Sequence, residues 1–201
     1  MSTTIEQIES FFIHQGFKYV LDSENNLIET SFVTETYTNA QGEHYLPVVV
    51  ELQEEGQFIQ IYVPQCYEVS EIEYRSTVLQ VLLMISWRTK MVQFELDAQS
   101  NTVRVIVEFP LEDALLTKNQ LMRSIMGLLQ TIEKFHPIIQ IALVEGRVDF
   151  DILDKPSIDI DIVVEHFRAL VDILETMGVN VQEILQASQS ENETSDDDEF
   201  I

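Results

Sequence analysis

The sequence predicts an α+β protein in which an antiparallel sheet is flanked by helices. Segments rich in β-branched and aromatic residues, typical of strands, fall into two groups, at residues 17–63 and 91–109. A short amphipathic helix is expected before the first group, an apolar helix between the groups, and a long amphipathic helix after the second. Turn-forming residues separate most of the strands within each group, so consecutive strands are expected to pair in antiparallel fashion.

The composition is that of a globular protein with one sizeable core. The chain has 201 residues, is 45% hydrophobic and 23% charged, and carries a formal net charge of −24. This charge repels phosphate backbones and anionic lipid headgroups, so we expect neither nucleic acid nor a membrane as partner. The start of the sequence lacks the features of a signal peptide, and Cys66, the single cysteine, cannot form an internal disulfide. We therefore expect a cytoplasmic protein.

The first helix and four strands are expected within residues 3–63. The apolar residues at helical spacing in the first helix are Ile5, Ile8, Phe12 and Ile13. Gly16 suits the position just after the helix end. The strands are expected at residues 17–21, 27–37, 45–52 and 58–63. Because Pro47 cannot donate to a strand ladder, the third strand is expected to have a bulge or an edge near its start.

The next helix, at residues 76–87, is apolar on almost every side, and Ser70 or Ser76 could cap its start. A sheet buries only one face of such a helix, so the opposite face needs a further partner. Two alternatives remain open, namely complete burial inside a monomer and a homodimer interface. The residues assigned to the dimer interface are Val78, Val81, Met84, Ile85 and Trp87.

Two further strands and a long helix are expected in residues 91–146. Alternation gives the strands one core face and one mostly polar face, whose polarity Met91 and Ile106 interrupt. Thr117 and Gln120 match a capping box. The inward stripe of the helix consists of Leu121, Ile125, Leu128, Leu129 and Ile132. Pro137 is expected to kink or split this helix near His136, and Gly146 to end it.

Residues 1–146 are thus predicted to form one α+β domain. Beyond it we expect an acidic connector at 147–161, an amphipathic helix at 162–187 and an acidic disordered tail at 188–201. A calcium loop at Asp149, Asp151 and Asp154 would lack the glycine and glutamate that such loops require, so a solvated acidic edge is favoured. The tail could instead be an arm whose terminal Phe200 and Ile201 dock in a groove. Whether helix and tail block or form a binding site stays open.

Enzyme signatures are missing from the sequence. There is no G-x-S-x-G elbow, P-loop, G-x-G-x-x-G motif or pair of cysteines at zinc spacing. The histidines are scattered over different elements, at His14, His44, His136 and His166, and structural roles are expected for them. Cys66 is expected to be a small buried hydrophobe. We therefore predict no catalytic residue, cofactor or metal.

The chain resembles a known family in three stretches. These are "FFIHQGFKYVLDSENNLIET", "VLLMISWRTKMVQFELDAQSNTVRVIVEFPLED" and "FHPIIQIALVEG", within residues 3–146. Their order is similar to that of the type III secretion chaperone-like fold and, within it, the YbjN-like proteins named as bacterial sensory transduction regulators. The resemblance implies a small acidic homodimer that dimerises through its middle helix and holds an extended segment of a client protein. The partner of residues 76–87 would then be the same helix of a second copy.

We therefore predict a non-enzymatic chaperone-like protein or assembly factor. It would bind a client segment by strand addition to a sheet edge and by burial of apolar side chains. The expected client-binding residues are Val49, Phe58, Tyr62, Met91 and Ile106. One alternative is a regulatory module that senses a small ligand between sheet and helices, although the sequence offers no set of converging polar groups. An enzyme is the third alternative.

Overall fold

The computed structural model describes residues 2–69 and 73–151. The chain divides into two compact units, Met1–Ile152 and Leu153–Ile201, and everything below concerns the first. The predicted helix at 162–187 and tail at 188–201 lie outside the described residues. The same holds for Ser70, Asp154, His166, Phe200 and Ile201. The domain boundaries drawn from the sequence stay predictions.

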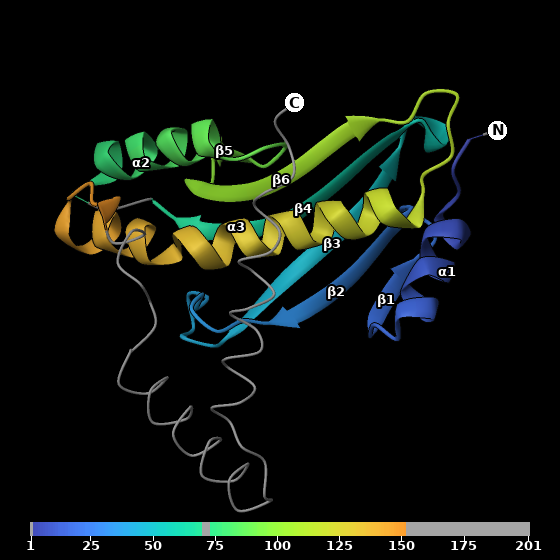
Figure 1. The fold of residues 1–201 in the computed structure, drawn as a ribbon, viewed down its shortest axis with the longest axis horizontal. Helices are drawn as coiled ribbons and strands as arrows, with labels where there is room; N and C mark the ends of the chain where they lie inside the picture. The colour runs from blue at the N-terminus through green and yellow to red at the C-terminus, as the bar shows by residue number, and fades with distance from the viewer. Residues whose placement is uncertain (1, 70–72, 152–201) are drawn as a thin grey trace, which may run out of the picture. The chain divides into compact units, whose positions relative to one another are not determined.

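The elements follow the predicted order. They are α1 (Ile5–Gln15), β1 (Tyr19–Asp22), β2 (Leu27–Val33), β3 (Tyr45–Gln53), a short 3-10 turn η1 (Glu54–Gly56), β4 (Phe58–Glu68), α2 (Arg75–Arg88), β5 (Gln93–Asp97), β6 (Thr102–Pro110) and α3 (Lys118–Glu145). The predicted fold class, α+β with an antiparallel sheet flanked by helices, is confirmed (Figure 1).

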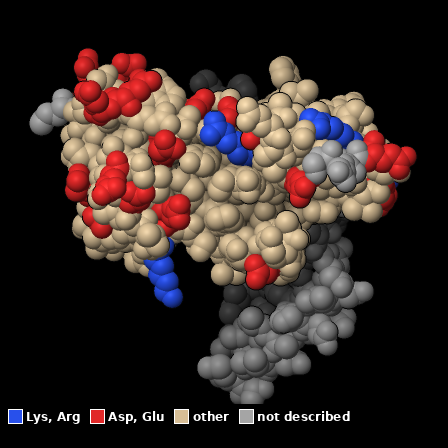
Figure 2. Space-filling view, turned by 180° about the vertical axis from the view of Figure 1, so that it is seen from behind, with Lys and Arg blue, Asp and Glu red and all other residues tan. Residues whose placement is uncertain are grey.

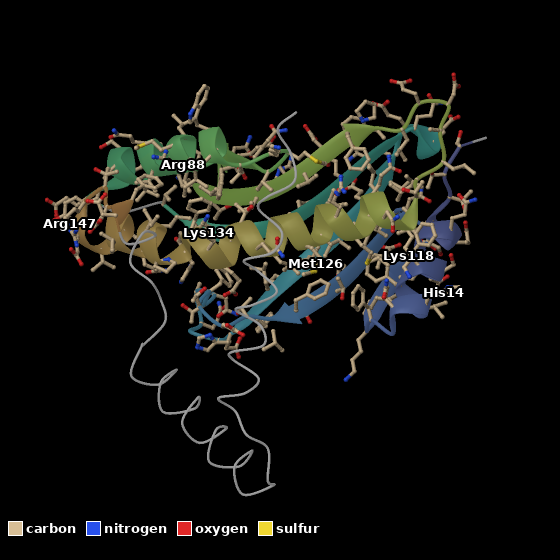
Figure 3. The ribbon with its side chains drawn as sticks, in the orientation of Figure 1. His14, Arg88, Lys118, Met126, Lys134 and Arg147 are labelled. Carbon is tan, nitrogen blue, oxygen red and sulfur yellow. The ribbon has the colours of Figure 1, made fainter. Side chains whose placement is uncertain are left out.

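One six-stranded sheet has the order β1-β2-β3-β4-β6-β5, and every neighbouring pair is antiparallel. The described helices pack on the same face of this sheet, where α3 crosses its middle, α1 covers the β1 side and α2 the β5 side (Figure 1). Lys118 and Arg147 mark the two ends of α3 in Figure 3. Fully buried residues of this core include Phe12, Ile28, Leu46, Ile59, Ile61, Leu121, Ile125 and Leu128.

The opposite face of the sheet is covered by no element among the described residues. Strand alternation sends the core residues Ile59, Ile61 and Val63 of β4 toward the helices, and Phe58, Gln60 and Tyr62 to the other side. The same alternation holds on β3 and β6 through the register of the pairs. We call this second side of the sheet the open face.

The helix starts agree in part with the sequence. Thr117 and Gln120 form the predicted capping box of α3, and Thr4 with Gln7 forms another at α1. The predicted cap Ser76 is wrong, because α2 begins after Tyr74, whose side chain makes no capping hydrogen bond. Ile13 also departs from the expectation. It is 60% exposed, since Ile5, Ile8 and Phe12 already fill the inward stripe of α1.

Pro137 does not split the helix, because α3 continues through it to Glu145. A proline inside a helix leaves the carbonyl four residues earlier without its N–H partner. Here that carbonyl belongs to Glu133, and it accepts a hydrogen bond from outside the helix. The proline therefore costs α3 less than it would cost an isolated helix.

Two irregular features of the central strands concern the open face. Near Pro47, β3 pairs with β2 only, since its ladder to β4 begins at Val49, and the edge predicted there is confirmed. Farther along, β4 has a bulge. Val63 pairs with Val105 and Tyr67 with Val103, so residues 64–66 stand opposite a single residue of β6.

Candidate functional site: the open face of the sheet

The open face brings together three residues that the sequence assigns to client binding. Val49 of β3 pairs with Tyr62 of β4, which pairs with Ile106 of β6. We call these three residues the apolar row. Neighbouring strands are about 4.8 Å apart, so the three side chains are direct neighbours along the row. The sequence thus predicted which residues share a face, because period-two alternation fixes it.

The five residues predicted to bind the client are not equally accessible to solvent. Ile106 is 0% and Val49 8% exposed. Both side chains are too deeply buried to form the contact surface that the sequence predicted for them. Phe58 and Tyr62 are half-buried, and Met91, just before β5, is 51% exposed. The accessible apolar surface here therefore comes mainly from Tyr62, Phe58 and Met91.

Two hollows lie at opposite sides of the apolar row. One, of about 500 Å³, is lined by Tyr62, Pro64, Gln65, Glu95, Leu96, Asp97, Ser100, Thr102 and Arg104. The other, of about 410 Å³, is lined by Lys18, Tyr19, Val20, Glu29, Thr30, Ser31, Pro47, Val48, Val49 and Pro64. Pro64, in the bulge of β4, lines both of them. The two hollows and the apolar row thus form a surface that extends from β1 to β5.

Polar contacts hold the Tyr62 ring in place. Its hydroxyl donates a hydrogen bond to Glu51 Oε2 at 3.1 Å. Burial, and then the negative charge of Glu51, raises the pKa of Tyr62, so the phenol stays protonated and continues to donate. Arg104 lies over the same ring, 5.4 Å from its centre, and pairs with Glu95 at 2.7 Å. The aromatic ring is therefore fixed before any partner arrives.

Figure 2 shows this side of the molecule from behind the sheet. Several acidic side chains lie toward the end of the face where β4 begins, and near the middle a basic side chain lies beside acidic ones (Figure 2).

The predicted dimer residues on α2 separate into two groups. Val78, Val81 and Ile85 are 0% exposed, so they belong to the core of the chain itself and cannot form an interface, contrary to the sequence-based assignment. Met84 is half-buried, and Trp87 is 89% exposed. The sequence missed Leu83, which is 73% exposed one helical turn before Trp87. A helix apolar all round gives no sequence signal of which side faces the sheet.

A third hollow, of about 260 Å³, lies between α2 and β5. It is lined by Leu79, Leu82, Leu83, Ser86, Phe94, Leu96 and Val103. Ser86 already donates its hydroxyl hydrogen to the Leu82 carbonyl oxygen. A small-ligand site needs several converging polar groups. This space between sheet and helix therefore does not favour the sensory alternative.

A buried polar cluster under α3 was not predicted from the sequence. His136 Nδ1 lies 3.3 Å from the Tyr67 hydroxyl, and its Nε2 accepts the Thr38 N–H at 3.4 Å. Tyr37 donates to the carbonyl oxygen of Cys66. Burial raises the pKa of the Cys66 thiol to about 12 and lowers the pKa of His136. A neutral histidine and a protonated thiol fit the structural roles expected for both residues.

The described residues show no metal centre. Among them, no group of three or more His, Cys, Asp or Glu side chains could hold an ion. In the same part of the chain, no helix combines the length and the apolar character needed to cross a bilayer.

A comparison with models of known protein families finds one match. Residues 15–137 match the model of the family described as Domain of unknown function (DUF8183). The chain belongs to this family. The DUF8183 region includes β1 to β6 and most of α3, and hence the whole apolar row. No curated protein matches the sequence.

Several solved structures resemble this DUF8183 protein. The crystal structure of YbjN from E. coli has a TM-score of 0.44 and 13% identity, and the alignment covers 66% of this chain and 91% of YbjN. The HopA1–SchA chaperone–effector complex has a TM-score of 0.41 and 13% identity, with 63% and 88% covered. An uncharacterized protein from Methanothermobacter thermautotrophicus has a TM-score of 0.41 and 18% identity, with 69% and 97% covered.

Two of these three structures match the groups that the sequence resembles. At TM-scores below 0.5, such likeness carries no inference about what this chain binds.

Proposed function

We propose that this chain is a non-enzymatic, chaperone-like protein or assembly factor that binds an extended segment of a client protein. The observation that carries the proposal is the open face, where the apolar row lies between two hollows and no described element covers it. An aromatic anchor beside pockets is the usual centre of a protein interface. Tyr62 would be that anchor.

The ends of the sheet support a contribution from strand addition. Within the described part of the chain, β1 and β5 each pair on one side only. A client strand could add to β5, where backbone hydrogen bonds would give affinity. Its side chains would then alternate between the hollow at α2 and the open face, because Phe94 lines the first and Glu95 the second.

A homodimer in the cytoplasm is part of the same proposal. Leu83 and Trp87 form an exposed apolar pair at the end of α2, and the chain would bury them against a second copy. Tryptophan is among the residues most enriched at energetically important interface positions.

The test of client binding is a pull-down from native lysate with the full-length chain. The face variant carries Phe58→Ser and Tyr62→Ser, and the matched control carries Ile13→Ser and Val144→Ser, which remove exposed apolar side chains from α1 and α3. A stoichiometric client retained by the wild type and the control, but reduced about tenfold by the face variant, supports the proposal. Equal retention by the face variant contradicts it.

A further inference from the structure

A second row of residues crosses the open face, two residues along the strands from the apolar row. It consists of Glu51 on β3, Gln60 on β4 and Glu108 on β6, which pair in register. We call it the acidic row. Its side chains are half-buried. Two strand spacings of about 4.8 Å place the backbones of Glu51 and Glu108 about 10 Å apart, with Gln60 between them.

Neutral donors hold both carboxylates in position. Glu51 accepts from the Gln53 amide at 2.8 Å and from the Tyr62 hydroxyl at 3.1 Å. Glu108 accepts from the Gln60 amide at 2.7 Å. Amides and phenols orient a carboxylate but bring no positive charge to it.

Among the described residues, no ion pair includes a carboxylate of the acidic row. Arg104 pairs with Glu95 at 2.7 Å, and Arg147 pairs with its own neighbours beyond the end of α3. Within this part of the chain, neither carboxylate of the acidic row has a basic side chain at ion-pair distance. Half-buried carboxylates without a cation favour a partner that supplies one.

Apolar residues lie on both sides of the acidic row along β4. Phe58 precedes Gln60 by two residues, and Tyr62 follows it by two. Alternate residues on a strand are about 6.8 Å apart. An extended segment lying over the face along β4 has the same repeat, so its own alternate side chains would meet these rows one after another.

We propose that the client segment on the open face is basic and has a defined pattern. Its side chains facing the sheet would be apolar, then Lys or Arg, then apolar, at every second position. The Lys or Arg would bind between Glu51 and Glu108, and the apolar side chains would contact Phe58 and Tyr62. This inference rests on the proposed function and names the chemistry of its client.

The charge of the whole chain favours the same partner. A net charge of −24 attracts a basic segment over long range and speeds its association. The same charge rejects acidic segments of similar hydrophobicity, which gives selectivity. Arg and Lys also have long aliphatic stems that pack well beside aromatic rings such as Tyr62.

A random twelve-residue peptide library displayed on phage tests the inference with the full-length chain. The charge variant carries Glu51→Gln and Glu108→Gln. The matched control carries Glu24→Gln and Glu73→Gln, which remove the same charge from exposed acids outside the strands. A third protein carries Phe58→Ser and Tyr62→Ser. Thermal melts of all four proteins verify folding, and fluorescence anisotropy of the selected peptides gives their affinities.

We expect the wild type and the control to enrich Lys or Arg two positions from apolar residues. The charge variant should bind these peptides about tenfold more weakly and lose the basic enrichment. Enrichment of apolar peptides without basic residues, lost only in the Phe58 and Tyr62 variant, would overturn the basic client and leave the proposed function standing. Selected peptides that bind all four proteins equally would overturn both.

Discussion

The hydroxyl of Thr36 lies 2.8 Å from the carbonyl oxygen of Glu133, the carbonyl that Pro137 leaves without a helical donor. The Glu133 carboxylate also accepts the backbone N–H of Thr36 at 2.8 Å and that of Glu35 at 3.2 Å. Burial alone would raise the pKa of Glu133, but the hydrogen bond from the Thr36 hydroxyl to the carboxylate and those from the backbone N–H groups of Thr36, Tyr37 and Glu35 outweigh it and lower the pKa. One residue of α3 thus holds the segment that follows β2 by both its main chain and its side chain.

Replacing Thr36 by Val should lower the free energy of unfolding by about 1 kcal/mol, because Glu133 loses the hydroxyl donor that its carbonyl and carboxylate oxygens share. Urea unfolding measures the loss. In a Pro137→Ala background the loss should be smaller, since Ala at this position supplies the missing helical N–H. Equal losses in the two backgrounds would show that the proline and the hydroxyl are not coupled.

The free energy of unfolding should fall as the pH drops below about 6.5, the ordinary pKa of histidine. Burial lowers the pKa of His136, with His44 adding to the shift and Glu133 opposing it. The unfolded chain therefore binds a proton in this range that the folded chain does not, and stability is lost as the pH falls from about 6.5 toward the lower folded pKa.

His136→Gln should remove this part of the pH dependence, and His14→Gln, at an exposed position on α1, should leave it unchanged. Urea unfolding at several pH values from neutrality downward gives the change of the free energy of unfolding with pH for each protein. If the free energy of unfolding of His136→Gln depends on pH as strongly as that of the wild type, another group binds the proton.

The Cys66 thiol should react with Ellman's reagent at least about a hundredfold more slowly in the folded chain than in urea. It is buried, and burial raises its pKa to about 12, which leaves almost no thiolate near neutral pH. An exposed thiol introduced by Ser23→Cys in a Cys66→Ser background should react at similar rates in both conditions. Rapid labelling of native Cys66 would mean that the cluster around Tyr37 opens readily.

Leu83→Glu with Trp87→Ala should convert the proposed dimer to a monomer of about 23.2 kDa in sedimentation velocity. The control Ile13→Glu, on exposed α1 surface, should stay dimeric. Val81→Glu is no substitute, because it places a carboxylate in the core and should unfold the chain. A wild type that sediments as a monomer would contradict the dimer.

The fold was predictable wherever the periodicity of a single element decides it. Alternation at Val103, Val105 and Val107 identified the core side of β6, and Gly16, with φ 69°, ended α1 as expected. The apolar row followed from the same alternation on three strands. These predictions need only the local spacing of residues, because period and turn chemistry are properties of the sequence itself.

The predictions that failed depend on contacts between distant segments. Pro137 is tolerated because of Thr36, about a hundred residues earlier, and no local pattern links the two. Ile106 was assigned to a contact surface, yet its side chain is 0% exposed. Neither the hydrogen bonds at Glu133 nor the polar cluster at His136 has a sequence motif, since each forms only when α3 packs against the segment after β2.

Because of the bulge in β4, it matters for the sheet whether an odd or an even number of residues is deleted there, and the length of the segment matters less. Residues 64–66 stand opposite one residue of β6, an excess of two, so side chains beyond the bulge return to their original sides. Deleting one of these residues would turn Tyr67 toward the open face and expose its hydroxyl to solvent. Deleting two would only straighten the strand. Homologous chains can therefore differ here by two residues and keep the same side chains on each face of the sheet. A difference of one residue would move the buried side chains beyond the bulge to the open face and the open-face side chains to the core.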